Sequence, residues 1–434
     1  MIAAMAAATW LAAAQIAAAQ VKTCPFDVAD VIEQAEGQLA EVYAMRGFVG
    51  ETAITTLPEH LIERLGAYIG HRQSAAERRG NAIAIFVARD ERLCALYAWN
   101  AAGSLEYELV ELPVSATTAK GLIERNLDEL ISSGARVERA PAQRGVVAFR
   151  GARAARSPDV ILGEIANALF PSPRFRMIER QIASLSIVPA LDIGRLPFAA
   201  MDLDGDGRPL AETTAVNVEA SLKNVLDETA FGWTPGFARP VVLGDPDATG
   251  DPDWLLPRLP GARDEADAVA AIMKARAVTD RAATKAGLLP LLGQADYVHI
   301  AAHGIASSSN PMDGGFVALS DGRLTARQIQ SLTLEGHPLV VLSACQTALG
   351  RPLEGGIVGV ARAFLLAGST AVVASLWNVD DQATAAIMVD FARNLDTMEP
   401  ATALRLAQVK ARAANPDPRI WSAFMLFGGR IVGQ

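Results

Sequence analysis

Two apolar runs in this chain of 434 residues each lead to a residue that can act as a base or a nucleophile. The run that starts at Tyr297 ends on His303, and the run that starts at Leu339 ends on Cys345. Apolar runs of this length, bounded by glycine and polar residues, are typical of buried strands in a parallel sheet. Open α/β sheets place their reactive groups just beyond the carboxyl ends of such strands. The sequence therefore predicts that His303 and Cys345 meet at one edge of a sheet, where they could form a nucleophile–base pair.

The C-terminal half of the chain alternates between strand-like and helix-like segments. The alternation begins at Pro240, so we place an internal boundary near Gly236. It predicts an α/β fold with a mainly parallel sheet that is covered by helices on both faces. The expected elements are a strand at 240–246, helices at 262–275 and 282–292, the two strands that lead to His303 and Cys345, a helix at 356–367, a strand at 370–377, helices at 381–395 and 401–414, and a strand at 420–426.

Two further regions precede that boundary. Residues 81–236 form an earlier half, and residues 21–80 form a short helical segment followed by a linker. The earlier half has runs of alternating or continuous apolar residues that predict strands, and one segment with a helical pattern. Its expected elements are strands at 82–88, 93–99 and 105–112 and a helix at 119–133.

The first 20 residues carry no charge and are mostly alanine. Three small residues, 17–19, come just before Val21, so the segment resembles an export signal with a small-residue cleavage site. We interpret residues 1–20 as a signal peptide or an N-terminal membrane anchor, which predicts a periplasmic or secreted protein. An alanine-rich helix of a cytoplasmic protein is the alternative. In an exported protein, Cys24 and Cys94 could pair and leave Cys345 as the odd thiol.

The composition narrows the classes of function. The formal net charge is −9 at pH 7, which argues against a broad electrostatic contact with nucleic acid. Hydrophobic residues make up 51% of the chain and charged residues 20%, as in a globular protein. The three cysteines include no Cys-x-x-Cys pair, so neither a disulfide scaffold nor a structural zinc site is expected.

Two patterns in the sequence resemble metal sites. His299 and His303 stand four residues apart, but on a strand their side chains would lie about 13 Å apart, too far to share an ion. We therefore interpret His299 as a buried, hydrogen-bonded histidine. The run from Asp202 to Gly207 resembles the start of a calcium loop, but Thr213 stands where the loop needs glutamate, so a tight turn between strands is the better interpretation. No metal or cofactor is predicted.

The residues beside the two strand ends suit cysteine chemistry. The thiolate is the attacking form of cysteine, and a neighbouring imidazole can take its proton and later protonate the leaving group. Gly304 follows His303, and its unhindered N–H could form an oxyanion hole together with the N–H of Cys345. The polar segment 305–315 could border a cleft.

Several further segments surround these residues in a fixed order. They are 299–304, 319–322, 342–347, 354–356, 361–368 and 373–381, with 187–189, 196–198 and 259–262 upstream. In this order they resemble the CHAT domains, which are caspase-like cysteine peptidases related to separase. The resemblance extends from about Ala82 to the C-terminus.

The resemblance implies a fold and a set of roles. The fold would be a caspase-like α/β/α sandwich, with 81–236 as a degenerate, non-catalytic half and 237–434 as the catalytic half. His303 would be the general base and Cys345 the nucleophile, acting on a protein or peptide substrate without a cofactor. The regulatory partner is left open, because many relatives carry helical repeat arrays as a sensing module, whereas only about 60 residues precede the domain here.

Two acidic residues, Asp380 and Asp381, follow the strand that ends at Trp377. An acidic wall would attract an arginine or lysine side chain before the scissile bond. Asp381 could equally be the N-cap of the helix that follows. The predicted function is a cysteine endopeptidase with a basic residue as the expected preference. The alternatives are a catalytically idle interaction module of the same fold, and a thiol acyltransferase or esterase that uses the same dyad.

Overall fold

The computed structural model describes residues 22–28, 30–31, 35, 65, 69, 79–100, 104–132, 156–219, 235–254, 256–307, 309–344, 351–353, 356–378 and 381–428. The predicted signal peptide or anchor at 1–20 and most of the predicted helical segment at 21–80 lie outside these residues, and so do Cys345 and Asp380. Within the described part of the chain, no helix is both long enough and apolar enough to cross a membrane.

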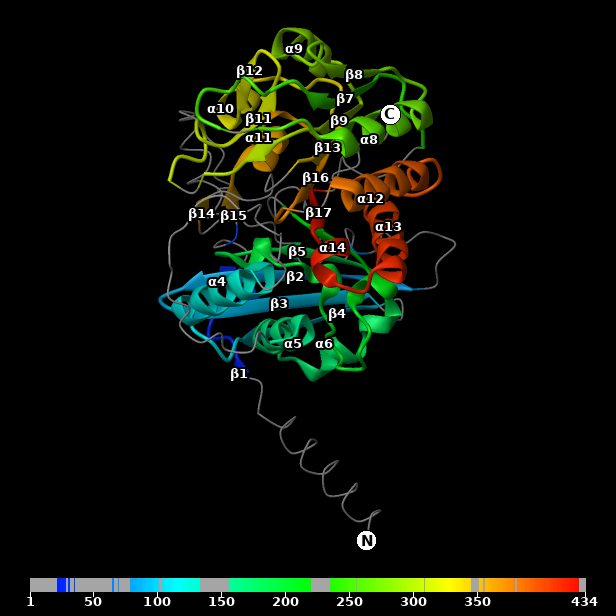
Figure 1. Cartoon of the computed structure of the whole chain (residues 1–434). Coiled ribbons are helices and arrows are strands. Elements are labelled where there is room, and N and C mark those ends of the chain that lie inside the picture. The colour runs from blue at the N-terminus through cyan, green and yellow to red at the C-terminus, as the bar shows by residue number, and fades with distance from the viewer. Residues whose placement is uncertain are drawn as a thin grey trace, which may run out of the picture.

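One 12-stranded sheet runs through the molecule (Figure 1). In spatial order its strands are β1 (Lys22–Thr23), β4 (Leu105–Glu111), β3 (Arg92–Asn100), β2 (Gly80–Arg89), β5 (Ile182–Val188), β6 (Ala215–Val218), β17 (Phe424–Gly428), β16 (Ala371–Ser375), β13 (Leu339–Ser343), β9 (Tyr297–Ala301), β7 (Pro240–Pro246) and β8 (Ala277–Asp280). The first six strands belong to the earlier half of the chain and the last six to the C-terminal half. The two halves are joined where β17 pairs in parallel with β6.

The sheet is parallel where the predicted site lies. β13 pairs in parallel with β9 and β16, and β7 pairs in parallel with β9 and β8. The last strand, β17, is antiparallel to β16, and β2, β3 and β4 form an antiparallel meander. The prediction of a mainly parallel sheet preceded by a second α/β half is confirmed.

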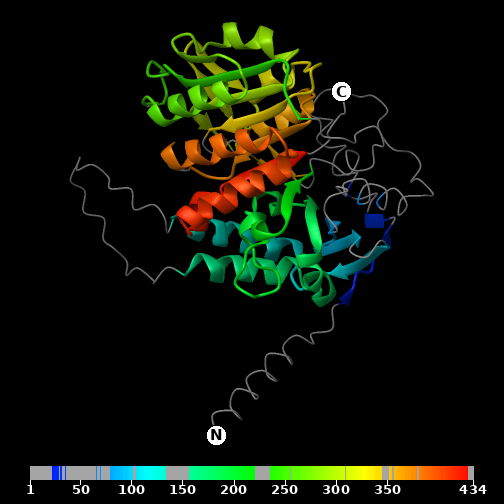
Figure 2. The same cartoon turned by 90° about the vertical axis from the view of Figure 1, so that its right-hand side faces the viewer.

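Helices cover both faces of the C-terminal half. On one face α8 (Pro260–Ile272), α12 (Asp381–Asn394) and α13 (Pro400–Ala414) pack side by side, and on the other α10 (Ala326–Gln330) packs on α11 (Val360–Ala367) (Figure 1). Figure 2 shows α13 running along the junction of the two halves, where it contacts β6 and β17. The remaining helices are α4 (Ala116–Ser132), α5 (Pro158–Leu169), α6 (Pro173–Met177), α9 (Lys285–Leu292) and α14 (Pro418–Trp421), with 3₁₀ turns η1 (Glu179–Gln181), η2 (Ile193–Arg195), η3 (Phe198–Ala200) and η4 (Leu210–Glu212).

The core explains why the two central strands are apolar throughout. Every residue of β9 and β13 is buried, because helices cover both faces of the sheet at this point. Helix α8 packs closely on β7 at Gly244, where an added Cβ would lie 2.3 Å from Cβ of Ala266 and 2.6 Å from the carbonyl oxygen of Ala262. This glycine brings α8 near the carboxyl edge of the sheet.

Three segments differ from the sequence-based expectation. The segment after His303 is not simply a polar loop, because β10 (Gly304–Ile305), β11 (Phe316–Leu319) and β12 (Gly322–Thr325) form a small antiparallel sheet. The predicted helix at 356–367 begins only at 360, because β15 (Gly356–Val358) pairs with β14 (Arg351–Leu353). The predicted last strand begins only at 424, because Pro418 and the side-chain cap of Asp417 start α14.

Cys24 and Cys94 form a disulfide. Both cysteines are buried, in a second apolar cluster on the face of β2 and β3 that also includes Val31 and Leu65. The bridge fastens the start of the described chain to β3, and it is the pairing that the sequence suggested for an exported protein.

Candidate active site

The two predicted strands are neighbours in the sheet. β9 and β13 run parallel and in register along their whole length. Beyond the strands, the N–H of Ala302 donates a 3.2 Å hydrogen bond to the carbonyl of Ser343. His303 follows Ala302 directly. Cys345 lies outside the described residues, and Ala344, the residue before it, is the last described residue at this end of β13.

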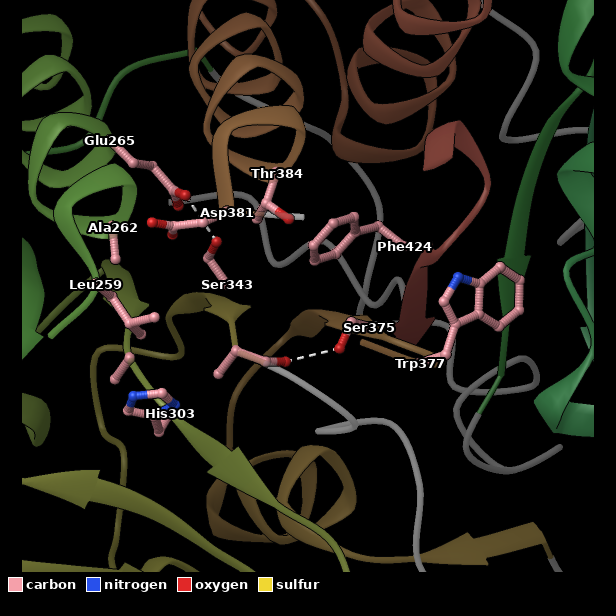
Figure 3. A pocket seen from close by; sticks show the side chains of 12 residues that line it. Leu259, Ala262, Glu265, His303, Ser343, Ser375, Trp377, Asp381, Thr384 and Phe424 are labelled. Carbon is pink, nitrogen blue, oxygen red and sulfur yellow. Dashed lines mark hydrogen bonds between the residues drawn. The ribbon is translucent and has the colours of Figure 1, made fainter. Parts of the chain in front are cut away.

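An open pocket lies at this edge of the sheet (Figure 3). It has a volume of about 90 Å³ and is bounded by the ends of β9, β13 and β16 and the starts of α8, α12 and β17. Its lining residues are Leu259, Ala262, Glu265, Ala302, His303, Ser343, Ala344, Ser375, Trp377, Asp381, Thr384 and Phe424. His303 and Ala344 therefore open into the same cavity.

One nitrogen of the His303 imidazole has a fixed role. Its Nε2 lies 2.6 Å from the carbonyl oxygen of Pro257. A carbonyl can only accept a hydrogen bond, so Nε2 must carry the proton of the neutral ring. Nδ1 then holds the free lone pair, which is what a general base needs.

Ion pairs at the ends of β7 and β8 hold the segment that carries Pro257. Arg258 pairs with both Asp245 and Asp280, and Arg263 pairs with the same two carboxylates. The hydrogen bonds from Arg263 and Arg258 hold the pKa of Asp280 well below its usual range. The carbonyl that fixes the tautomer of the histidine is therefore presented by an anchored segment.

The backbone N–H of Gly304 points away from its own sheet. The N–H of Ala318 donates a 2.9 Å hydrogen bond to the carbonyl of His303, so these two residues form a hydrogen-bonded pair of the antiparallel ladder. The next pair, Gly304 with Val317, is therefore of the non-hydrogen-bonded kind. In such a pair the N–H points outward, on the side of β10 that is opposite to β11.

Asp381 both lines the pocket and caps a helix. Its Oδ2 accepts a 2.7 Å hydrogen bond from the N–H of Gly261, in the first turn of α8. The sequence offered pocket wall or cap of the following helix as alternatives, and the helix that receives the carboxylate is a different one. Asp380 lies outside the described residues.

Comparison with known proteins places the chain in a family. Residues 160–429, well over half of the chain, match the CHAT domain family. The chain belongs to this family. It is 28% identical over 218 residues to the human protein named tetratricopeptide repeat protein 28, and 27% identical to the mouse protein of the same name. The match covers 41% of this chain and 9% of each relative, so the CHAT chain spans less than a tenth of their length.

Solved structures of separase and of a gingipain resemble the CHAT chain. Separase from the Saccharomyces cerevisiae separase–securin complex superposes with a TM-score of 0.52 and 11% identity, over 86% of this chain and 31% of separase. Gingipain R, an Arg-specific cysteine proteinase, gives 0.42 and 12%, over 60% of this chain and 67% of gingipain. At these identities the separase likeness is one of fold, and the predicted caspase-like α/β/α fold is confirmed.

A buried polar network lies beneath the pocket of the CHAT domain. Glu265 of α8 accepts at one carboxylate oxygen from Oγ of Ser343 at 2.9 Å, and its other oxygen lies 2.6 Å from Nε2 of His299. Nδ1 of His299 lies 3.0 Å from the hydroxyl of Tyr297. All four side chains are at most 5% exposed. The prediction that His299 is a buried, hydrogen-bonded histidine is confirmed.

Glu265 and Ser343 were not predicted as site residues from the sequence. Glu265 shares one face of α8 with the buried residues Ala262, Ala266 and Val269. An acidic residue in the middle of an apolar helix face is a signal that it has a buried partner. Ser343, a polar residue within the apolar run of β13, is the matching signal on the strand.

The aspartate-rich segment forms a turn, as predicted, but between η3 and η4 rather than between strands. Asp202 accepts hydrogen bonds of 2.7 Å from the N–H groups of both Gly205 and Gly207. Asp204 and Asp206 pair with Arg180. Carboxylate oxygens of the three aspartates lie within 4.8 Å of one another. Arg208 also pairs with Asp206, so two arginines face the three carboxylates.

Proposed function

We propose that this CHAT domain is a cysteine endopeptidase in which His303 is the general base and Cys345 the nucleophile. The observation that supports the proposal is the hydrogen bond between Nε2 of His303 and the Pro257 carbonyl, because it leaves Nδ1 as the base. The pocket beside His303 is also lined by Ala344, the residue before Cys345.

The proposed reaction begins with proton transfer from the Cys345 thiol to Nδ1 of His303. The thiolate attacks the peptide carbonyl, and the resulting oxyanion would be bound by the N–H groups of Gly304 and Cys345. As the C–N bond breaks, the imidazolium gives its proton to the leaving amine and an acyl-enzyme remains. The imidazole then takes a proton from water, whose oxygen attacks the thioester carbonyl. The C–S bond breaks, the acid is released, and the imidazolium returns its proton to the Cys345 thiolate.

The proposed substrate has an arginine or lysine before the scissile bond. Asp381 contributes a carboxylate to the pocket wall, and the described residues that line the pocket include no lysine or arginine. A basic side chain would be attracted to such a wall through charge-assisted hydrogen bonds. Asp380 is proposed as a second acidic group of the same wall.

The test is a peptide library incubated with the full chain and with Cys345→Ala, read by mass spectrometry. We expect cuts that depend on Cys345 and that follow arginine or lysine. Cuts after acidic residues would contradict the basic preference alone. A folded wild type without any Cys345-dependent cut would favour the idle interaction module, and hydrolysis of small esters without peptide cleavage would favour the acyltransferase or esterase.

We also propose that the protein is exported, with residues 1–20 as the signal or anchor. The disulfide between Cys24 and Cys94 supports this, because such bonds persist in oxidising compartments and are rare in the cytosol. N-terminal sequencing of the protein from its native host tests the cleavage. A thiol assay on protein that is unfolded but not reduced tests the disulfide. We expect one reactive thiol per chain, and three reactive thiols would contradict the proposal.

A further inference from the structure

Glu265 connects the two strands that carry the proposed dyad. The residue sits on α8, and its carboxylate reaches His299 in β9 and Ser343 in β13. Its side chain is 1% exposed, although it lies directly behind the pocket wall (Figure 3). A buried carboxylate needs compensating hydrogen bonds, and here both oxygens have one.

The hydrogen-bond partners fix where the protons lie. Burial, and then the negative charge of Glu265, raise the pKa of Tyr297, so its hydroxyl keeps its proton and acts as a donor. If Tyr297 donates to Nδ1 of His299, then Nε2 of His299 donates to Glu265, and the hydroxyl of Ser343 donates to the second oxygen. Every member of the network is then satisfied when Glu265 is ionised. A protonated Glu265 would leave the Tyr297 hydroxyl without an acceptor in the network.

The same network holds the backbone just before Cys345. The side chain of Ser343 is fixed by Glu265, while its carbonyl accepts from Ala302, which precedes His303. The carbonyl of Ala344 accepts a 2.6 Å hydrogen bond from Oγ of Ser375, on the neighbouring strand β16 (Figure 3). Ser343 and Ala344, the two residues that precede Cys345, are therefore hydrogen-bonded to neighbours on both sides of β13.

We propose that Glu265 is a positioning residue that holds together the ends of β9 and β13, the strands that lead to His303 and Cys345, and places a fixed negative charge beside the pocket that His303 lines. The inference rests on the proposed function, because it assigns the dyad to these two residues. Its charge favours the protonated forms of nearby groups, both the thiol and the imidazolium. Glu265 thus sets the pH range in which the thiolate–imidazolium pair exists.

The charged and titratable groups that face this site come from each of the packed elements. They are Glu265 of α8, Tyr297 and His299 of β9, His303 beyond β9 and Asp381 of α12. Among the described ones, Glu265 and Asp381 are the carboxylates that line the pocket. Removing the charge of Glu265 alone should therefore move the pH response of the dyad without removing the acid proposed to bind substrate.

The experiment measures how fast iodoacetamide alkylates Cys345 in the intact chain between pH 5 and pH 9. The disulfide removes Cys24 and Cys94 from the reaction, so mass spectrometry reads Cys345. In Glu265→Gln the amide oxygen can accept from Nε2 of His299 and the amide nitrogen can donate to Oγ of Ser343, so both contacts can be kept with the Ser343 bond reversed while the charge is lost. We expect the alkylation profile to move to lower pH by about one unit. The matched control is Asp264→Asn, which removes an exposed charge one residue away. Its alkylation profile should match that of the wild type.

A second variant, Ser343→Ala, tests the positioning directly and keeps the charge. For a cleaved peptide we expect kcat to fall about 10-fold or more with little change in KM, because the dyad rather than the substrate contacts is displaced. An unshifted profile in folded Glu265→Gln, or a wild-type kcat in Ser343→Ala, would overturn the inference. A wild type that cleaves no peptide would contradict the proposed function instead, and the alkylation profile would still decide the role of the charge.

Discussion

The carboxylate of Asp381 accepts its hydrogen bond from the backbone of Gly261, 120 residues earlier in the chain. This contact joins the starts of α8 and α12 at the pocket wall. It is possible because residue 261 has no side chain, since a Cβ there would lie 2.5 Å from Cγ of Asp381.

Gly261→Ala should therefore displace the acid of the pocket. We expect a loss of only about 1 kcal/mol in the free energy of unfolding, from the broken hydrogen bond, because the atoms that the new Cβ meets are the carboxylate end of a side chain that can move aside. We also expect a larger fall of kcat/KM for peptides with arginine before the scissile bond than for peptides without it. The control is Gly163→Ala in α5, where an added Cβ meets nothing within 4 Å and should not destabilise the protein. Equal losses for both kinds of peptide would speak against Asp381 as the specificity residue.

Loss of the base at His303 should be severe and partly reversible. His303→Ala is expected to lower kcat by about 10²–10⁴-fold, the usual contribution of a positioned acid–base group. Free imidazole added to the variant should restore part of the rate, because the vacated pocket can admit it. A variant that keeps wild-type kcat would remove His303 from the mechanism.

Close packing of α8 on β7 predicts a strong effect at Gly244. Alanine there would place its Cβ 2.3 Å from Cβ of Ala266, and the contacts are backbone and short side chain, which cannot move aside. We expect a loss of about 1–3 kcal/mol or more in the free energy of unfolding, measured by denaturant titration. If Gly244→Ala had wild-type stability, α8 would have to be able to shift along the sheet. Such a shift would also change the shape of the pocket.

Glu179 gives a pH dependence of stability far from the pocket. Burial, and then the charge of Asp204, raise the pKa of Glu179 to about 7 in the folded protein. A raised carboxyl pKa means that the folded state binds the proton more tightly than the unfolded state. The contribution of Glu179 to the free energy of unfolding is therefore fully present below pH 4.5 and is lost as the pH rises from about 4.5 to 7. Glu179→Gln should raise the Tm relative to the wild type at pH 8 and not at pH 4, and an equal rise at both pH values would contradict this.

The disulfide should contribute measurably to stability. The two cysteines are 70 residues apart, and closing a loop of that length is worth about 4 kcal/mol in the chain-entropy account. Cys24→Ser/Cys94→Ser should lower the Tm of the full chain, and a reducing agent should lower the Tm of the wild type but not of the double variant. An unchanged Tm in both comparisons would indicate that the bridge does not form in solution.

Local patterns in the sequence were sufficient to predict the central strands and most of the helices. Continuous apolar runs identified β9 and β13 because strands covered on both faces carry few polar residues. The same runs led to His303, because open α/β sheets place their reactive groups just beyond the carboxyl ends of the strands. The short β10 was missed because Gly304 and Ile305 gain strand structure only by pairing with β11, a contact that no local pattern encodes.

Long-range contacts account for the rest of the site. The bond from Gly261 to Asp381 and the link from Glu265 to Ser343 each join residues that only the folded sheet brings together. Asp381 lies beside the pocket, yet its hydrogen bond to the first turn of α8 could not be deduced from its neighbours in sequence. Tertiary contacts of this kind decide side-chain roles after the strand order is set.

The pairing of β17 with β6 has a consequence for how the chain can be divided. Phe424, at one end of β17, lines the pocket, while Leu426 and Phe427 of the same strand pair with the earlier half at Asn217 and Val218. A fragment that began near Gly236 would leave this strand with a row of unpaired backbone groups, the kind of edge that aggregates. The earlier half of the chain therefore covers a sheet edge of the C-terminal half, and the strand at that edge carries part of the pocket wall.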